Sequence, residues 1–176
     1  MTRETLGFDD DQNLLDLAAR VGESLTQRGW MLVTAESCTG GWVGQAVTAV
    51  AGSSIWYDRG FITYSNRSKC EMLGVQQSTL DHFGAVSPQT AQEMVMGALA
   101  RSHAQIGLSI TGIAGPDGGT TTKPVGMVCF AWASKEGLVQ QETRHFKGDR
   151  KSIRHSAVTT SLQGILHLLD NAIVMA

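Results

Sequence analysis

Residues 34–41 form the segment of this 176-residue chain with the strongest potential for nucleophilic chemistry. They read Thr-Ala-Glu-Ser-Cys-Thr-Gly-Gly and lie between an apolar run and a helical pattern, which predicts a strand-to-helix turn. The hydroxyl of Ser37 becomes a nucleophile once a base takes its proton, and free backbone N–H groups at such a turn can bind an oxyanion. Gly40 and Gly41 leave room for a ligand beside the backbone.

A structural interpretation of the same turn stays open. Serine and threonine are favoured helix caps, so Ser37 or Thr39 could simply cap the helix that follows. Cys38 could also act as the nucleophile, but a lone cysteine in such a turn is more typical of a packed, unreactive side chain.

Tyr64 and Lys69 form a second candidate group. If Tyr64 ends a strand and Lys69 lies one turn into a helix, both side chains can reach one cleft. A lysine acts as a general base only when burial or a neighbouring cation lowers its pKa. Tyr64 could then relay a proton or donate to a developing charge, whereas a solvated Lys69 on a helix face is the structural alternative.

Two further segments could hold an anion. Residues 111–119 form a glycine-rich loop that lacks the Gly-Lys-Ser/Thr ending of a Walker A loop. Arg150 and Lys151 follow Asp149, a good N-cap, so both cations fall where the helix dipole is already positive. A bound phosphate or carboxylate would explain them. A mobile surface loop and a solvated helix start are the alternatives.

The composition limits the classes of function. The formal net charge is −2 and no basic run is present, so we expect no nucleic-acid binding. No apolar run reaches the about 18 residues of a membrane span. Three separated cysteines and no secretory signal favour a cytoplasmic location. Histidines without metal-ligand spacing predict no metal. The low charged share of 17% and a methionine-rich helix around Met94 and Met96 favour a homo-oligomer.

The elements that must position these residues alternate between strands and helices. We expect a loose, flexible tail over 1–11 and one domain over 12–176, an α/β fold of three layers in which helices flank a mixed, mostly parallel sheet. Strands are predicted at 31–35, 56–64, 106–110, 125–132 and 138–146. Helices are predicted around 14–25, 42–50, 66–73 and 77–82, after Ser87-Pro88, and after Asp149.

The sequence that carries these segments resembles the nicotinamide-nucleotide amidohydrolases. This family includes the C-terminal domain of the competence-damage-inducible protein CinA, and the present chain resembles its stand-alone form. The resemblance rests on ordered segments over nearly the whole chain: Thr-Ala-Glu-Ser-Cys-Thr-Gly-Gly at 34–41, Ala-Gly-Ser-Ser at 51–54, Gly-Phe-Ile-Thr-Tyr-Ser-Asn at 60–66 with Lys69, Gly-Ala-Val-Ser at 84–87, Thr-Gly-Ile-Ala-Gly-Pro-Asp-Gly-Gly at 111–119, Lys-Pro-Val-Gly at 123–126, and Gly-Asp-Arg at 148–150.

The resemblance implies an amidohydrolase that converts nicotinamide mononucleotide and water to nicotinic acid mononucleotide and ammonia. It implies Ser37 as nucleophile, Lys69 as its base, and assistance from Tyr64 and Arg150, with no cofactor and no metal. We expect the nucleotide substrate to contact Thr39, Gly40, Gly41, Asn66, Gly112, Ala114, Gly115 and Lys151. Arg150 could instead lie near Lys69 and lower its pKa. A catalytically inactive nucleotide-binding module of the same fold is the alternative function.

Overall fold

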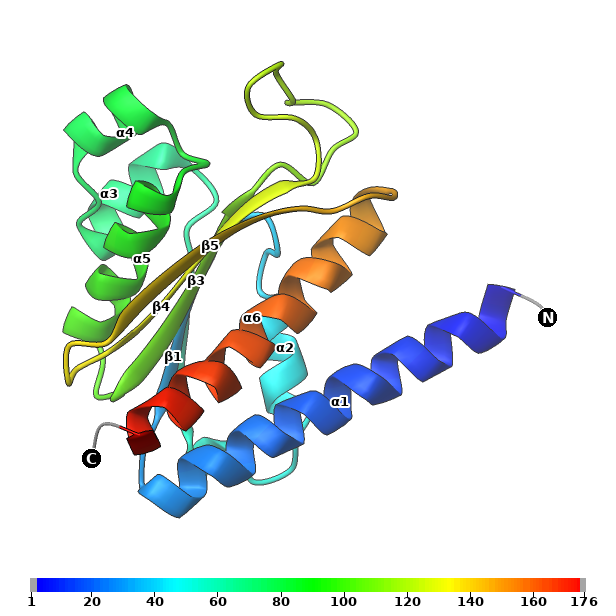
Figure 1. The fold of residues 1–176 in the computed structure, drawn as a ribbon, viewed down its shortest axis with the longest axis vertical. Coiled ribbons are helices and arrows are strands. Elements are labelled where there is room, and N and C mark those ends of the chain that lie inside the picture. The colour runs from blue at the N-terminus through cyan, green and yellow to red at the C-terminus, as the bar shows by residue number, and fades with distance from the viewer. Residues whose placement is uncertain (1–2, 175–176) are drawn as a thin grey trace.

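A five-stranded mixed sheet forms the middle layer of the computed structural model, which describes the backbone of residues 3–174 and the side chains of residues 11–170 (Figure 1). The strand order is β2-β1-β3-β4-β5. Pairing is parallel from β2 through β1 to β3 and antiparallel from β3 through β4 to β5, so β4 alone among these strands runs in the opposite direction. The strands are β1 Leu32–Glu36, β2 Tyr57–Ile62, β3 Ile106–Gly112, β4 Met127–Ser134 and β5 Val139–His145.

Helices cover both faces of the sheet, as the sequence predicts for three layers (Figure 1). One face carries α1 Arg3–Arg28, α2 Trp42–Thr48 and α6 Arg150–Val174, and a short 3-10 turn, η1 Ser53–Ile55, follows α2. The other face carries α3 Asn66–Leu73, α4 Gln77–Phe83 and α5 Pro88–Ala100. In the part of the chain that the structure describes, no helix is long and apolar enough to cross a membrane.

The side chains of β4 alternate between two separate cores. Phe130 and Trp132 point to the α1–α6 face, whereas Cys129, Ala131 and Ala133 point to the α5 face. Because successive residues of a strand face opposite sides, this alternation gives one face large side chains and the other small ones. Small residues allow α5 to pack close to the sheet.

Two helix caps that the sequence predicts are confirmed. The hydroxyl of Ser87 accepts a hydrogen bond from the N–H of Thr90 at the start of α5. The carboxylate of Asp149 accepts from the N–H of Ser152 at 2.8 Å at the start of α6. These caps fix where α5 and α6 begin, and therefore where Arg150 lies.

The first helix differs from the prediction. The sequence predicts a loose tail over residues 1–11, but α1 begins at Arg3, and only residues 1–2 of that tail lie outside the described residues. No proline interrupts this stretch, and extending an existing helix requires no new nucleus. The domain boundary at residue 12 stays a prediction.

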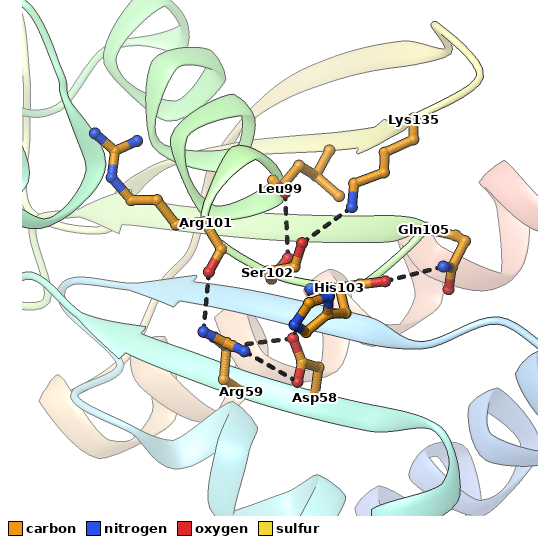
Figure 2. A network of polar contacts seen from close by, with 8 residues as sticks. All are labelled: Asp58, Arg59, Leu99, Arg101, Ser102, His103, Gln105 and Lys135. Carbon is orange, nitrogen blue, oxygen red and sulfur yellow. Dashed lines mark hydrogen bonds and ion pairs between the residues drawn. The ribbon is translucent and has the colours of Figure 1, made fainter.

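A polar network holds together the end of the sheet at which β3 begins (Figure 2). The carboxylate of Asp58 accepts from the side chain of Arg59 and from the N–H of His103 at 2.9 Å. Arg59 also donates to the carbonyl of Arg101, and Lys135 donates to that of Ser102. The network ties β2 to the loop before β3. Because β1, β2 and β3 run parallel, their carboxyl ends meet at the opposite end of the sheet.

Candidate active site

Ser37 lies directly after β1, between two parallel neighbours. Its N–H donates to the carbonyl of Ile110 on β3 at 3.0 Å. The carboxyl ends of adjacent parallel strands are where open α/β sheets usually hold ligands. A cavity of about 270 Å³ opens at this edge. It is lined by Ser37, Cys38, Tyr64, Asn66, Lys69, Ala85, Val86, Thr111, Gly112, Ile113, Ala114, Gly115, Asp117, Gly118 and Arg150.

Lys69 is buried against Ser37. The Nζ of Lys69 donates to Ser37 Oγ at 3.0 Å and to the carbonyl oxygen of Thr63 at 2.7 Å, and only 1% of the lysine is exposed. Burial penalises the charged ammonium and lowers the pKa of Lys69 to about 8. An appreciable fraction of neutral amine is therefore present near neutral pH, which is what a general base requires.

The start of α3 places Lys69 at this position. The Ser65 side chain accepts from the N–H of Ser68, and the hydroxyl of Ser68 accepts from the N–H of Ser65, which forms a reciprocal cap. Lys69 follows in the first turn, as the sequence predicts, and reaches back to the carbonyl of Thr63 just after β2. The alternative of a solvated lysine on a helix face is wrong.

Arg150 binds groups on both sides of the cavity. Its Nη2 donates to the phenolic oxygen of Tyr64 at 3.0 Å, and its Nη1 donates to the carbonyl of Gly115 at 2.7 Å. The pKa of Lys69 is lowered by burial, and the guanidinium of Arg150 makes no contribution to this shift. The suggested role of Arg150 in tuning Lys69 therefore gains no support.

Cys38 is buried, as the sequence analysis predicts for a packed, unreactive cysteine. Burial raises the pKa of its thiol to about 12, so the thiol stays protonated. A protonated, buried thiol is a poor nucleophile compared with an activated serine. Of the two side chains considered as nucleophiles, Ser37 is the one whose side chain is hydrogen-bonded to the amine of Lys69.

Glu36 caps α2, a function that the sequence prediction missed. Its carboxylate accepts from the N–H groups of Gly41, Val43 and Gly44 at 2.9–3.1 Å and from the Thr39 hydroxyl at 2.6 Å, with 2% of the residue exposed. The alternative in which Ser37 or Thr39 caps α2 is wrong, because Glu36 reaches forward from the strand and Thr39 donates to it. An acidic residue just before a helix start was the available signal.

Eight of the expected site residues line the cavity: Ser37, Tyr64, Asn66, Lys69, Gly112, Ala114, Gly115 and Arg150. Four do not: Thr39, Gly40, Gly41 and Lys151. The Thr39 hydroxyl and the Gly41 N–H are bonded to Glu36, and the Gly40 N–H donates to the carbonyl of Ser37. Lys151 lies outside the cavity, because successive helical residues point about 100° apart and Arg150 takes the direction of the cavity.

Hydrogen bonds hold the glycine-rich loop between β3 and β4 at two points, one at the cavity and one outside it. Gly115 accepts from Arg150, and the ammonium of Lys123 donates to the carbonyl of Phe83 at the end of α4. Asp117, which the sequence prediction did not single out, also lines the cavity. Among the residues with described side chains, no cluster of three or more His, Cys, Asp or Glu residues could hold a metal ion.

Fold and site together define a three-layer α/β protein with a buried serine–lysine pair at the carboxyl edge of its sheet. The chain belongs to the CinA C-terminal domain family, whose model matches residues 14–169. The nicotinamide-nucleotide amidohydrolase PncC of Enterobacter agglomerans is 48% identical over 156 residues, which cover 89% of this chain and 95% of that protein. The protein of the same name from Escherichia coli K12 is 49% identical over 155 residues, covering 87% and 93% respectively.

Solved structures share the whole fold. The competence/damage inducible protein CihA from Agrobacterium tumefaciens superposes with a TM-score of 0.86 at 47% identity, covering 89% of this chain and 95% of that one. A CinA superfamily protein from Klebsiella pneumoniae superposes with a TM-score of 0.86 at 37% identity, covering 90% and 98%. The similarity therefore extends over the elements that build the cavity.

Proposed function

We propose that this protein hydrolyses the carboxamide of nicotinamide mononucleotide to give nicotinic acid mononucleotide and ammonia. The observation that carries the proposal is the 3.0 Å contact between Lys69 Nζ and Ser37 Oγ beside an open cavity. Relatives named nicotinamide-nucleotide amidohydrolase, at 48–49% identity, support the choice of substrate.

In the proposed reaction, neutral Lys69 takes the hydroxyl proton of Ser37 as Oγ attacks the carboxamide carbon. The tetrahedral intermediate collapses when its C–N bond breaks, and the ammonium of Lys69 returns the proton to the departing ammonia. Water then attacks the Ser37 ester, again with Lys69 as base. Ser37 is released as the free hydroxyl, and the product carries the carboxylate.

Arg150 provides the cation for the 5′-phosphate of the substrate. The sequence leaves two locations open for this anion, and Arg150 joins them, because its guanidinium bonds the carbonyl of Gly115 in the glycine-rich loop. A guanidinium suits phosphate geometry well. Tyr64, bonded to the same guanidinium, would polarise the substrate or relay a proton.

We further propose that the enzyme works in the cytoplasm as a homo-oligomer. Its three thiols are free, as expected in a reducing compartment. Met94 is buried in the chain's own core, so of these two methionines Met96, 45% exposed, is the one available for a subunit contact. Mass measurement in solution tests the oligomer.

The decisive experiment measures ammonia release from nicotinamide mononucleotide by the wild type and by Ser37→Ala. We expect kcat to fall by at least about 10³-fold in the variant. Ser109→Ala is the matched control, since Ser109 is also buried but donates only to the carbonyl of Ala91. Equal rates in wild type and Ser37→Ala would exclude the proposed mechanism. Nucleotide binding by calorimetry without turnover would instead favour a binding module.

A further inference from the structure

We propose that Arg154 is a positioning residue that holds the backbone turn of Cys38 and Thr39, so that the N–H of Cys38 serves as the oxyanion donor beside Ser37. The proposal rests on the amide hydrolysis proposed above, because only a tetrahedral intermediate requires such a site. Arg154 is not within the cavity lining, and it does not contact Ser37 or Lys69 in any hydrogen bond of the described residues.

Arg154 reaches the turn from α6, more than a hundred residues away in sequence. Its Nε donates to the carbonyl of Cys38 at 3.0 Å, and its Nη2 donates to that of Thr39 at 2.8 Å. The guanidinium carbon lies 5.3 Å from the ring centroid of Trp42, which holds the guanidinium plane from a second side. The half-buried side chain is thus fixed by three contacts.

These bonds determine the direction of an N–H group. In a trans peptide the C=O and the next N–H point in opposite directions. Because Arg154 draws the carbonyl of Cys38 toward α6, the N–H of Thr39 points away from α6. The N–H of Cys38 is fixed through the next peptide. Arg154 bonds the carbonyl of Thr39, and the N–H of Gly40 in that same peptide donates to the carbonyl of Ser37 at 3.0 Å, which sets the peptide between Ser37 and Cys38.

The other backbone N–H groups of residues 37–45 already have hydrogen-bond acceptors within the protein. Between residues 37 and 45, the structure gives acceptors to every backbone N–H except those of Cys38 and Thr39. The carboxylate of Glu36 takes the first N–H groups of α2, so the helix start itself offers no anion site. Cys38, the residue after the proposed nucleophile, lines the cavity, where an oxyanion would form.

Two cations at this turn therefore have different functions in the proposal. Arg150 bonds Tyr64 and Gly115 at the cavity wall, whereas Arg154 bonds only the backbone behind the nucleophile. Preorganised N–H donors stabilise a transition state because they need no reorganisation as charge develops. Loss of Arg154 should therefore reduce kcat without affecting substrate binding.

The test compares Arg154→Met with Arg28→Met in ammonia release from nicotinamide mononucleotide. Arg28 is a matched control, because it also donates to two carbonyls, those of Ser24 and Leu169, far from the cavity. For Arg154→Met we expect kcat to fall by about 10- to 100-fold, with KM changed by less than about threefold. The midpoint of the pH profile should stay in place, since the burial of Lys69 is untouched.

Chemical rescue adds a measurement that a merely structural role would not change. Millimolar ethylguanidinium should restore part of the kcat of Arg154→Ala and none of that of Ser37→Ala. A folded Arg154→Met variant with kcat within about twofold of the wild type would overturn the proposal. A rise in KM with unchanged kcat would also overturn it, as would a loss of kcat equal to that of Arg28→Met.

A crystal structure of Arg154→Met makes the result independent of turnover. We expect the peptide between Cys38 and Thr39 to rotate away from its wild-type orientation, and an unchanged peptide would refute the positioning role. If the wild type releases no ammonia while this peptide rotates in the variant, the proposed function fails and the positioning of the turn by Arg154 stands.

Discussion

The side-chain nitrogen of Lys69 lies 3.0 Å from the hydroxyl oxygen of Ser37, although 32 residues separate them in sequence. The contact joins the end of β1 to the first turn of α3 across the carboxyl edge of the sheet. It places a lysine whose pKa burial lowers to about 8 beside a hydroxyl that needs a base. In the proposed mechanism this pair is sufficient for proton transfer in both steps.

The pH dependence of the proposed reaction should follow the titration of Lys69. The amine acts as a base only when neutral, and its pKa is about 8. Below that pH, kcat/KM for ammonia release should fall about tenfold per pH unit, and above it the profile should level off. Steady-state assays between about pH 6 and pH 9 check this. A flat profile over that range would show that Lys69 is not the base.

Replacing Lys69 by methionine should stabilise the fold at neutral pH. The folded pKa, about 8, lies below the ordinary value of 10.5, so below pH 8 the wild type carries the full cost of burying an ammonium. The carbonyl of Thr63 loses its donor, which offsets part of the gain. We expect the free energy of unfolding at pH 7 to rise by about 1–2 kcal/mol.

This stabilisation should shrink as the pH rises from 8 toward 10.5, because the wild-type lysine is then increasingly neutral in the folded state. Urea unfolding of both proteins at neutral and alkaline pH measures the difference. Lys135→Met is the control, since Lys135 is exposed at the opposite end of the sheet (Figure 2). A pH-independent effect of Lys69→Met would contradict the lowered pKa.

Glu36→Gln should destabilise the protein by about 2–4 kcal/mol. The glutamine amide has one acceptor oxygen, whereas the carboxylate accepts from Thr39, Gly41, Val43 and Gly44. The NH₂ group would also face backbone donors. Thermal or urea unfolding measures the loss. Glu71→Gln, at an exposed ion pair with Arg67, should cost at most about 0.5 kcal/mol. Equal effects would show that burial of Glu36 is unimportant.

Tyr64 and Arg150 should act as a unit. Tyr64→Phe removes the oxygen to which Arg150 donates at 3.0 Å, and we expect kcat to fall by about tenfold. Arg150→Met should cost about as much or more. The double variant should be little worse than the poorer single variant, because each change disrupts the same hydrogen bond. Losses that multiply within about twofold would show that the two side chains act independently.

The sequence determined the secondary structure well wherever a short pattern carried the signal. The helix predicted around residues 14–25 lies within α1, and the caps at Ser87 and Asp149 are confirmed. The apolar residues of that helix at helical spacing, Leu14, Leu17, Ala18, Val21 and Leu25, are buried. These features depend on residues within about four positions of one another, which is the reach of helical periodicity and capping. The turn that carries Ser37 was identified for the same reason.

The tertiary structure decided which of the candidate residues share a cavity. Lys151 follows the same cap as Arg150 but does not line the cavity, and Gly41 shares a turn with Ser37 but donates to Glu36. Arg154, on α6, is not among the site residues that the sequence predicts, because nothing in its local sequence points toward the backbone of Cys38 and Thr39.

The sequence by itself therefore determined the order and type of the elements, and the turn that holds Ser37. Only the packing of β2, α3 and α6 around that turn decided that Lys69 is buried with a lowered pKa and that Arg154 bonds the backbone of Cys38 and Thr39. Local patterns arise from interactions between near neighbours in the chain. Burial and the pKa that follows from it depend on groups brought together from distant segments.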